Sequence, residues 1–67
     1  MTREVNVNLI LEFRKATKMT VKEFCERSNI GTTTYYKIIN KKNAKIETLN
    51  GVAKTMKISV LNLLNEN

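Results

Sequence analysis

The side chains best suited to chemistry gather between residues 29 and 45. This segment holds Thr32, Thr33 and Thr34 in a row, then tyrosines at 35 and 36, then lysines at 37, 41, 42 and 45. Threonine and lysine side chains can hydrogen-bond to base edges, and lysine also binds phosphate as a point charge. The chain has no histidine, no aspartate and only scattered glutamates, so a metal cluster and an acid–base pair are not available. The segment therefore indicates recognition of a polar, anionic partner rather than catalysis.

The distribution of charge supports this reading. The net charge is +6, from 12 basic and six acidic residues. No acidic residue lies between Glu26 and Glu47, and the basic residues in that interval are Arg27, Lys37, Lys41, Lys42 and Lys45. A basic block on a small domain is typical of a protein that binds nucleic acid. A solubilising surface is the alternative explanation.

Length and composition limit what the chain can be. Its 67 residues predict one domain, residues 1–67, with a small core that association with a second copy would help to stabilise. The single cysteine, Cys25, excludes an internal disulfide framework. The N-terminal stretch places charges on both sides of a short apolar run, which is typical of neither a signal peptide nor a membrane span. We expect a cytoplasmic protein that uses no cofactor, no metal, no membrane and no small-molecule ligand.

Apolar residues recur at helical spacing along most of the chain, which predicts an all-α fold of five helices. Their expected ranges are 8–17, 20–28, 32–40, 46–56 and 60–66. The inner face of the first helix would consist of Leu9, Ile10, Phe13 and Ala16. A short β-like run, "VNVN" at residues 5–8, stands alone and is not counted as a strand, and residues 41–45 read as a polar loop.

Several residues mark the ends of these helices. Thr20 and Glu23 have the spacing of a capping box at the start of the second helix. Asn29 follows that helix where a left-handed backbone would be useful, and asparagine tolerates that conformation. Ser59 is placed to cap the last helix. Gly51, inside the fourth helix, should weaken that helix by about 1 kcal/mol relative to alanine unless close packing requires it.

Two short helices joined by a tight turn, with the second polar on one side, define a helix-turn-helix reader. The stretch from Met19 to Leu64, together with "ILEFRK" before it, resembles the XRE-type helix-turn-helix family, which includes Cro and the lambda-like phage repressors. Phe24 and Cys25 stand where this family usually has Leu-Ala, and Asn29 and Ile30 replace Gly-Val in the turn. The resemblance implies a compact five-helix, lambda-repressor-like domain with motif helices at about 20–28 and 32–40.

The resemblance also implies roles for single residues. Thr32 and Thr33 would meet base edges in the major groove, and Tyr36 and Lys37 would follow on the next outward turn. The implied phosphate contacts are Thr20, Asn40, Lys41, Lys42 and Lys45. Simpler alternatives remain: a solvated helix start for the three threonines, a surface aromatic for Tyr36, and a solvated loop for Lys41 and Lys42.

The chain departs from the family pattern at two places that bear on function. Val21 stands where many members have a glutamine that meets a phosphate. Arg14 is present, but the glutamate that often pairs with this arginine is replaced by Ile39, so Arg14 needs Glu12, Glu26, another partner or a phosphate. The recognition helix also lacks long amide side chains, so the shape of deformable DNA would contribute to specificity.

These observations predict a sequence-specific regulator of transcription that binds double-stranded DNA. The expected form is a Cro-like repressor that binds a palindromic operator as a homodimer, encoded by a phage or mobile element, or else a domain of a longer repressor. Leu61 and Leu64 would form the dimer contact, because four aliphatic residues in positions 60–64 exceed one helical stripe. The alternative is a protein-interaction module of the same fold, partner-binding or antitoxin-like. An enzyme with Tyr35 or Tyr36 as nucleophile is the least favoured class, and we expect no enzymatic activity.

Overall fold

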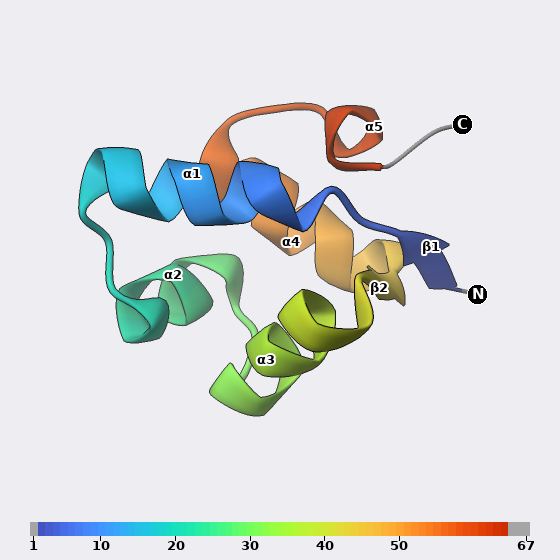
Figure 1. The fold of residues 1–67 in the computed structure, drawn as a ribbon, viewed down its shortest axis with the longest axis horizontal. Helices are drawn as coiled ribbons and strands as arrows, with labels where there is room; N and C mark the ends of the chain where they lie inside the picture. Colours follow the sequence, from blue (N-terminus) through green and yellow to red (C-terminus); the bar gives the residue numbers. More distant parts are fainter. Residues whose placement is uncertain (1, 65–67) are drawn as a thin grey trace.

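The computed structural model describes residues 2–64, which form five helices and two short strands. In chain order these are β1 (Thr2–Glu4), α1 (Val7–Thr17), α2 (Val21–Ser28), α3 (Thr32–Lys41), β2 (Asn43–Lys45), α4 (Ile46–Met56) and α5 (Val60–Leu63). In Figure 1, α1 and α5 lie along one side of α4, and α2 and α3 lie along the other side. The helical fold class predicted from the sequence is confirmed. Leu64 has an extended backbone, so the last helix ends earlier than expected; residues 65 and 66 of its expected range lie outside the described residues.

All five helices contribute to one core. The buried apolar residues are Val5, Ile10, Phe24, Cys25, Tyr35, Ile38, Ala44, Leu49, Val52, Ala53, Met56, Leu63 and Leu64. Ala16 was expected on the inner face of α1, but it is exposed. At 3.6 residues per turn, Ala16 lies about 120° around the helix from Ile10, so the core-facing side in the last turn falls on Arg14 instead.

The predicted helix ends are confirmed in atomic detail. The Thr20 hydroxyl accepts from the Glu23 backbone N–H at 3.1 Å, and the Glu23 carboxylate accepts from the Thr20 N–H at 3.4 Å. Asn29 has φ 58°, the left-handed conformation that ends α2. Ser59 caps α5 by accepting from the Leu61 N–H at 3.3 Å. These local signals fix where α2 and α5 begin and where α2 ends, and the end of α2 sets the start of the turn before α3.

A small sheet is present where the sequence indicated a polar loop. β1 pairs with β2 in antiparallel register, with Arg3 opposite Ala44 and Glu4 opposite Asn43. The expectation of a loop at 41–45 is therefore wrong: Lys41 ends α3, and residues 43–45 form β2. Three-residue strands carry too little alternation to be read from sequence, and these two are held by pairing across the chain.

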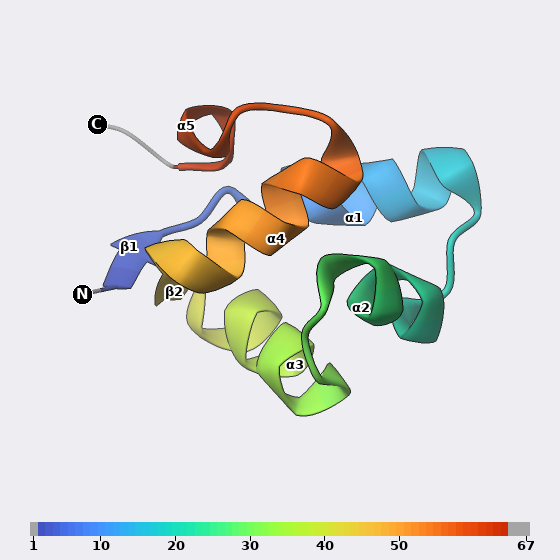
Figure 2. The same ribbon diagram turned by 180° about the vertical axis from the view of Figure 1, so that it is seen from behind.

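Close packing explains Gly51. An ideal Cβ at Gly51 would lie 2.5 Å from the backbone oxygen of Ser28, a distance at which one of the two helices would have to move. The Ser28 hydroxyl donates to Thr55 at 2.8 Å, and the Thr55 hydroxyl donates to the Gly51 carbonyl at 3.2 Å. The glycine weakens α4 as a helix, but it allows α4 to approach the end of α2. Figure 2 shows these two helices side by side from behind.

Candidate nucleic-acid interface

Helix α3 has a buried side and an exposed side. Tyr35 and Ile38 are each 2% exposed and face the core. Four of the predicted contact residues project into solvent from the other side, and they are Thr32, Thr33, Tyr36 and Lys37. The residue before α3 is Gly31, and no side chain caps the helix. The first turn of α3 therefore presents two short hydroxyl side chains and uncapped backbone N–H groups, all of which can form hydrogen bonds.

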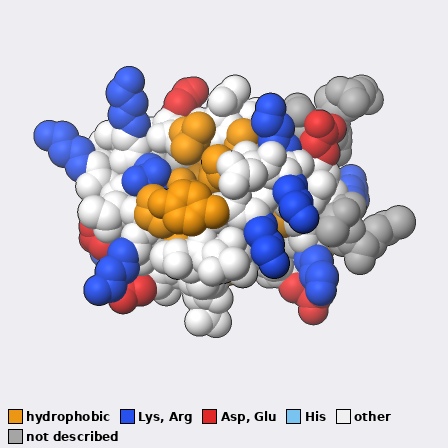
Figure 3. Space-filling view, turned by 60° about the horizontal axis from the view of Figure 1, so that its bottom comes forward, with side chains coloured by type: hydrophobic (Ala, Val, Ile, Leu, Met, Phe, Trp, Pro, Cys, Tyr) orange, Lys and Arg blue, Asp and Glu red, His pale blue; other side chains and the backbone are white. Residues whose placement is uncertain are grey.

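The predicted phosphate contacts at the end of α3 are exposed as well. Asn40 and Lys41 end the helix, Lys42 follows in the left-handed conformation with φ 58°, and Lys45 is the residue before α4. Figure 3 views the side of the molecule on which α3 lies. There, Lys and Arg side chains surround a small apolar patch, and the acidic side chains lie toward the rim. The basic block seen in the sequence contributes four exposed lysines, which are Lys37, Lys41, Lys42 and Lys45.

Three of the predicted contact lysines meet at one shallow hollow between α3, β2 and α4. Lys37, Lys41 and Lys45 line this hollow of about 360 Å³, together with Thr34 and Thr48. Lys42 and Thr20 do not line it. Thr20 stands at the start of α2, where its hydroxyl oxygen already accepts from Glu23. The structure thus brings the lysines of α3 and β2 together and leaves Thr20 as a separate contact candidate.

A row of aromatic rings runs from α1 to the exposed side of α3. The ring centroids of Phe13 and Phe24 are 6.1 Å apart, those of Phe24 and Tyr35 are 5.8 Å apart, and those of Tyr35 and Tyr36 are 5.2 Å apart. All three contacts are edge-to-face, the geometry favoured by aromatic quadrupoles. Tyr36, which is 50% exposed, therefore leans on a ring that belongs to the core.

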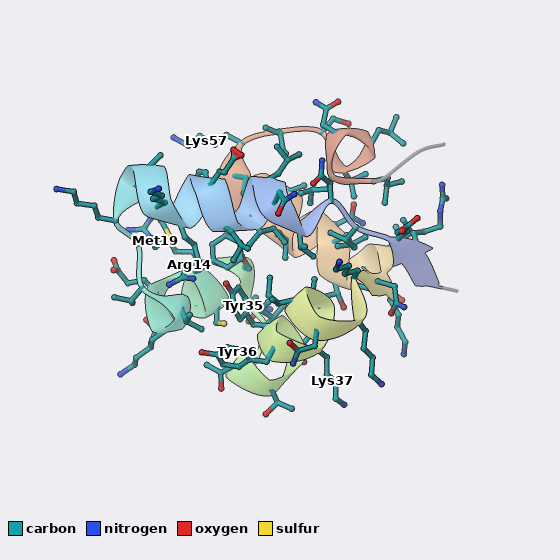
Figure 4. The ribbon with its side chains drawn as sticks, viewed as in Figure 1. Arg14, Met19, Tyr35, Tyr36, Lys37 and Lys57 are labelled. Atoms are coloured by element: carbon teal, nitrogen blue, oxygen red, sulfur yellow. The ribbon has the colours of Figure 1, made fainter. Side chains whose placement is uncertain are left out.

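Arg14 ties the end of α1 to the recognition helix. Its Nη1 donates to the Tyr35 hydroxyl at 3.1 Å, its Nε donates to the Met19 carbonyl at 3.2 Å, and its Cζ lies 5.7 Å from the centroid of the Tyr35 ring. Figure 4 shows Arg14 and Tyr35 close together while Lys37 points away from the body. Arg14 therefore binds the Tyr35 hydroxyl and the Met19 carbonyl rather than Glu12 or Glu26. A buried tyrosine hydroxyl needs a partner, and that requirement could have suggested this pairing.

Comparison with protein families identifies the family of this chain. A helix-turn-helix family model matches residues 10–63, from α1 through α5. The chain belongs to the XRE-type, lambda-repressor-like helix-turn-helix family. It is accordingly a DNA-binding regulator of the XRE type, and its partner is double-stranded DNA. A search of curated proteins and a search of solved structures each found no match.

The two leucines expected to join copies of this XRE-type domain differ in exposure. Leu61 is 65% exposed, whereas Leu64 is 8% exposed and belongs to the core of the chain itself. Leu64 bridges Val5 in antiparallel fashion. Because Leu64 already packs inside the domain, it offers little side-chain surface to a second copy. Leu61 is therefore the exposed member of the predicted pair.

Cys25 of the XRE-type domain is a core residue, as expected. It is 3% exposed and lies in α2. Burial raises the pKa of the Cys25 thiol above its ordinary value, and the positive charge of Arg14 opposes this rise. A thiol with a raised pKa carries little thiolate at neutral pH, so it is a poor nucleophile.

A second hollow of the XRE-type domain is lined by other residues than the candidate DNA contacts. It encloses about 950 Å³ where the end of α1, the turn after α2 and helix α4 meet, and its wall includes Phe13, Met19, Ile30 and Gly51. None of the predicted base or phosphate contacts lines it. In residues 2–64, moreover, no helix has the length and apolar character to cross a membrane.

Proposed function

We propose that this chain is a Cro-like repressor that binds a palindromic operator as a homodimer and acts by occupying the DNA. The observation that carries the proposal is the exposed side of α3. It offers hydroxyl groups in its first turn, an aromatic ring and a lysine in its second, and lysines at its end. These are the residue types that read base edges and then grip phosphate along one major groove.

Base reading is assigned to the first two turns of α3. Thr32 and Thr33 hydrogen-bond to base edges, and their methyl groups can also contact a thymine methyl. Lys37 donates to guanine O6 or N7, and Tyr36 contacts a base or the adjacent sugar and phosphate. These side chains are short or few, so sequence-dependent DNA shape supplies part of the specificity.

Phosphate binding is assigned to Asn40, Lys41, Lys42 and Lys45, with Thr20 as a further contact from α2. If three lysines of each copy neutralise phosphates, a dimer releases counterions from six sites. The logarithm of affinity should then fall with the logarithm of salt concentration at a slope of about −5. Such a slope is steep enough to separate a DNA-binding surface from a merely solubilising one.

Dimerisation is assigned to the surface around Leu61. A leucine with 65% of its surface exposed gains from burial against a second copy. Two copies related by a two-fold axis would place their α3 helices in successive major grooves, about 34 Å apart, which requires a palindromic site.

Leu61 also supports a second candidate function, a protein-interaction module that binds another regulator through this apolar surface. The two candidates respond differently to salt. Phosphate binding loses orders of magnitude in affinity over a modest rise in salt, whereas an apolar protein interface does not. Binding that survives high salt and requires Leu61 but not Lys42 would favour the interaction module.

The deciding experiment is selection from a random duplex pool, at low salt and again at near-physiological salt. We expect the same symmetric consensus to be enriched at both. Thr33→Ala and Lys37→Ala should then change the preferred sequence, and Lys42→Ala should weaken all sequences alike. Equal, sequence-blind losses from all three substitutions would refute the assignment of base readers. A pool without a consensus would refute the operator-binding function.

A further inference from the structure

The N-terminal segment lies outside the family match, which begins at residue 10, yet it is built into the DNA-binding side of the domain. β1 pairs with β2, the strand that follows the recognition helix. Just after β1, the Val5 N–H donates to the Lys42 carbonyl at 2.8 Å, and the Asn6 N–H donates to the Leu63 carbonyl at 2.8 Å. Val5 itself is 2% exposed. Residues 2–6 therefore join the end of α3 to the end of α5, as the position of β1 in Figure 1 illustrates.

Residues 2–6 directly contact the segment that carries the proposed phosphate-binding lysines. Lys42 is held from both sides, because its N–H donates to the Ile38 carbonyl at 2.8 Å and its carbonyl accepts from Val5. Lysine has no intrinsic preference for the left-handed conformation that Lys42 adopts. At the other end of β2, Lys45 stands opposite Thr2. Without β1, residues 42–45 would be a short, exposed connection between α3 and α4 with nothing on its outer side.

We propose that residues 2–6 are a positioning element of the DNA interface, which holds Lys42 and Lys45 where both can meet phosphates at once. This inference rests on the proposed function and adds a part of the chain that the family match does not cover. Holding the lysines in place before DNA arrives reduces the conformational entropy that each contact must overcome. The element acts through the lysines and need not touch DNA itself.

The test is a deletion of Thr2–Glu4, followed by affinity measurements on the selected operator duplex at several salt concentrations. The deletion removes one positive and one negative side chain, Arg3 and Glu4, so the net charge stays at +6. It spares Val5 and every other core residue. We expect helical circular dichroism to be retained, affinity to fall about tenfold, and the salt slope to shrink by about one for each chain bound. The preferred sequence should not change, because the first turn of α3 is untouched.

A pair of matched substitutions tests the same point without shortening the chain. Val5 donates across the ladder to Lys42, so the next hydrogen-bonded pair of the antiparallel register is Arg3 with Ala44. Arg3→Pro and Arg3→Ala remove the same charge, but only proline removes the ladder N–H. We expect Arg3→Pro to weaken binding several-fold more than Arg3→Ala does.

A double-mutant cycle separates positioning from general destabilisation. Lys45, which pairs with Thr2, loses its partner strand in the truncated chain. Lys45→Ala should therefore cost clearly less affinity in the truncated chain than in the full chain, whereas Thr33→Ala should cost the same in both. The inference would be overturned if the lysine substitution cost the same affinity in the truncated chain as in the full chain. It would also be overturned if the truncated chain folded and bound with unchanged affinity and salt slope. If the full chain binds no duplex, the proposed function fails first and this inference fails with it.

Discussion

Tyr35 and Tyr36 are neighbours of the same residue type, yet they belong to opposite sides of α3. Tyr35 is 2% exposed, accepts a hydrogen bond from Arg14 and stacks edge-to-face with Phe24. Tyr36 is 50% exposed and leans on Tyr35. Contacts within the chain thus account for the residues on the inner side of α3. They do not account for the residue types on its outer side. Changes on the inner side should cost stability, and changes on the outer side should cost binding.

The largest contrast should come from truncating each tyrosine. Tyr35→Ala leaves a cavity among Phe24, Ile38 and Arg14 and should cost about 3–5 kcal/mol, which is close to the whole stability of a domain this small. Tyr36→Ala should cost only about 1 kcal/mol, because it loses one edge-to-face contact with Tyr35 and leaves no buried cavity. Urea unfolding followed by circular dichroism measures both. Similar losses of stability for both variants would contradict the division of α3 into a structural side and a binding side. Weaker duplex binding by a folded Tyr36→Ala chain would support it.

The next contrast uses the two glycines. Gly51→Ala forces a Cβ against the Ser28 carbonyl oxygen, and the resulting overpacking should cost about 1–3 kcal/mol despite alanine's better helix propensity. Gly31→Ala places a Cβ where nothing lies within 4 Å, at the exposed start of α3. It should cost less than about 1 kcal/mol, because the only loss is that alanine is a poorer N-cap residue than glycine. Thermal unfolding of the two variants distinguishes them, and a stabilised Gly51→Ala chain would show that α4 can move away from α2.

A smaller effect should link α1 to the inner side of α3. Arg14→Met and Tyr35→Phe each remove one partner of the same hydrogen bond while keeping the core filled. Their double-mutant cycle should give a coupling free energy of unfolding of about 1 kcal/mol. The matched control pairs Arg14→Met with Tyr36→Phe, because the Tyr36 hydroxyl is not among the hydrogen-bond partners of Arg14 in residues 2–64, and this cycle should give no coupling. A coupling near zero in the first cycle would mean that Arg14 stabilises α3 only through its contact with the ring.

The sequence predicted what local signals determine. The capping box at Thr20, the left-handed Asn29 and the apolar period of residues 46–56 each depend on neighbours in the chain, and all three are confirmed. The sheet was missed because β1 and β2 are separated by some 40 residues and neither is a strand without the other. Arg14 and Tyr35 were each noticed, but the bond between them depends on how α1 crosses α3. Ala16 was misplaced because an alanine adds so little apolar signal that a small error in helical phase went unnoticed.

The candidate site likewise has features that local sequence predicts and features that depend on contacts between distant segments. Exposure of Thr32, Thr33, Tyr36 and Lys37 follows from the period of α3 once Tyr35 and Ile38 are placed inward. The burial of Leu64 does not follow from its own helix, because it depends on pairing with Val5 from the start of the chain. The outward side of a helix can therefore be predicted from one sequence where large apolar residues mark its inward side, and contacts between distant segments cannot.

The subtlest contrast lies in three lysines with nearly the same backbone. Helices α1, α3 and α4 end at Lys18, Lys42 and Lys57, with φ of 57°, 58° and 60°. Glycine adopts this left-handed conformation at lower energy than lysine does. Replacing each with glycine removes one positive charge and should stabilise the chain by up to about 1 kcal/mol, because glycine adopts the left-handed conformation without steric cost. Only Lys42→Gly should also weaken operator binding and lower the salt slope, because Lys42 alone follows the recognition helix. If Lys18→Gly or Lys57→Gly weakened binding as much, Lys42 would contribute no more to DNA affinity than lysines at the ends of other helices. If only Lys42→Gly did so, this strained lysine would be explained by the DNA that it meets rather than by the fold that it ends.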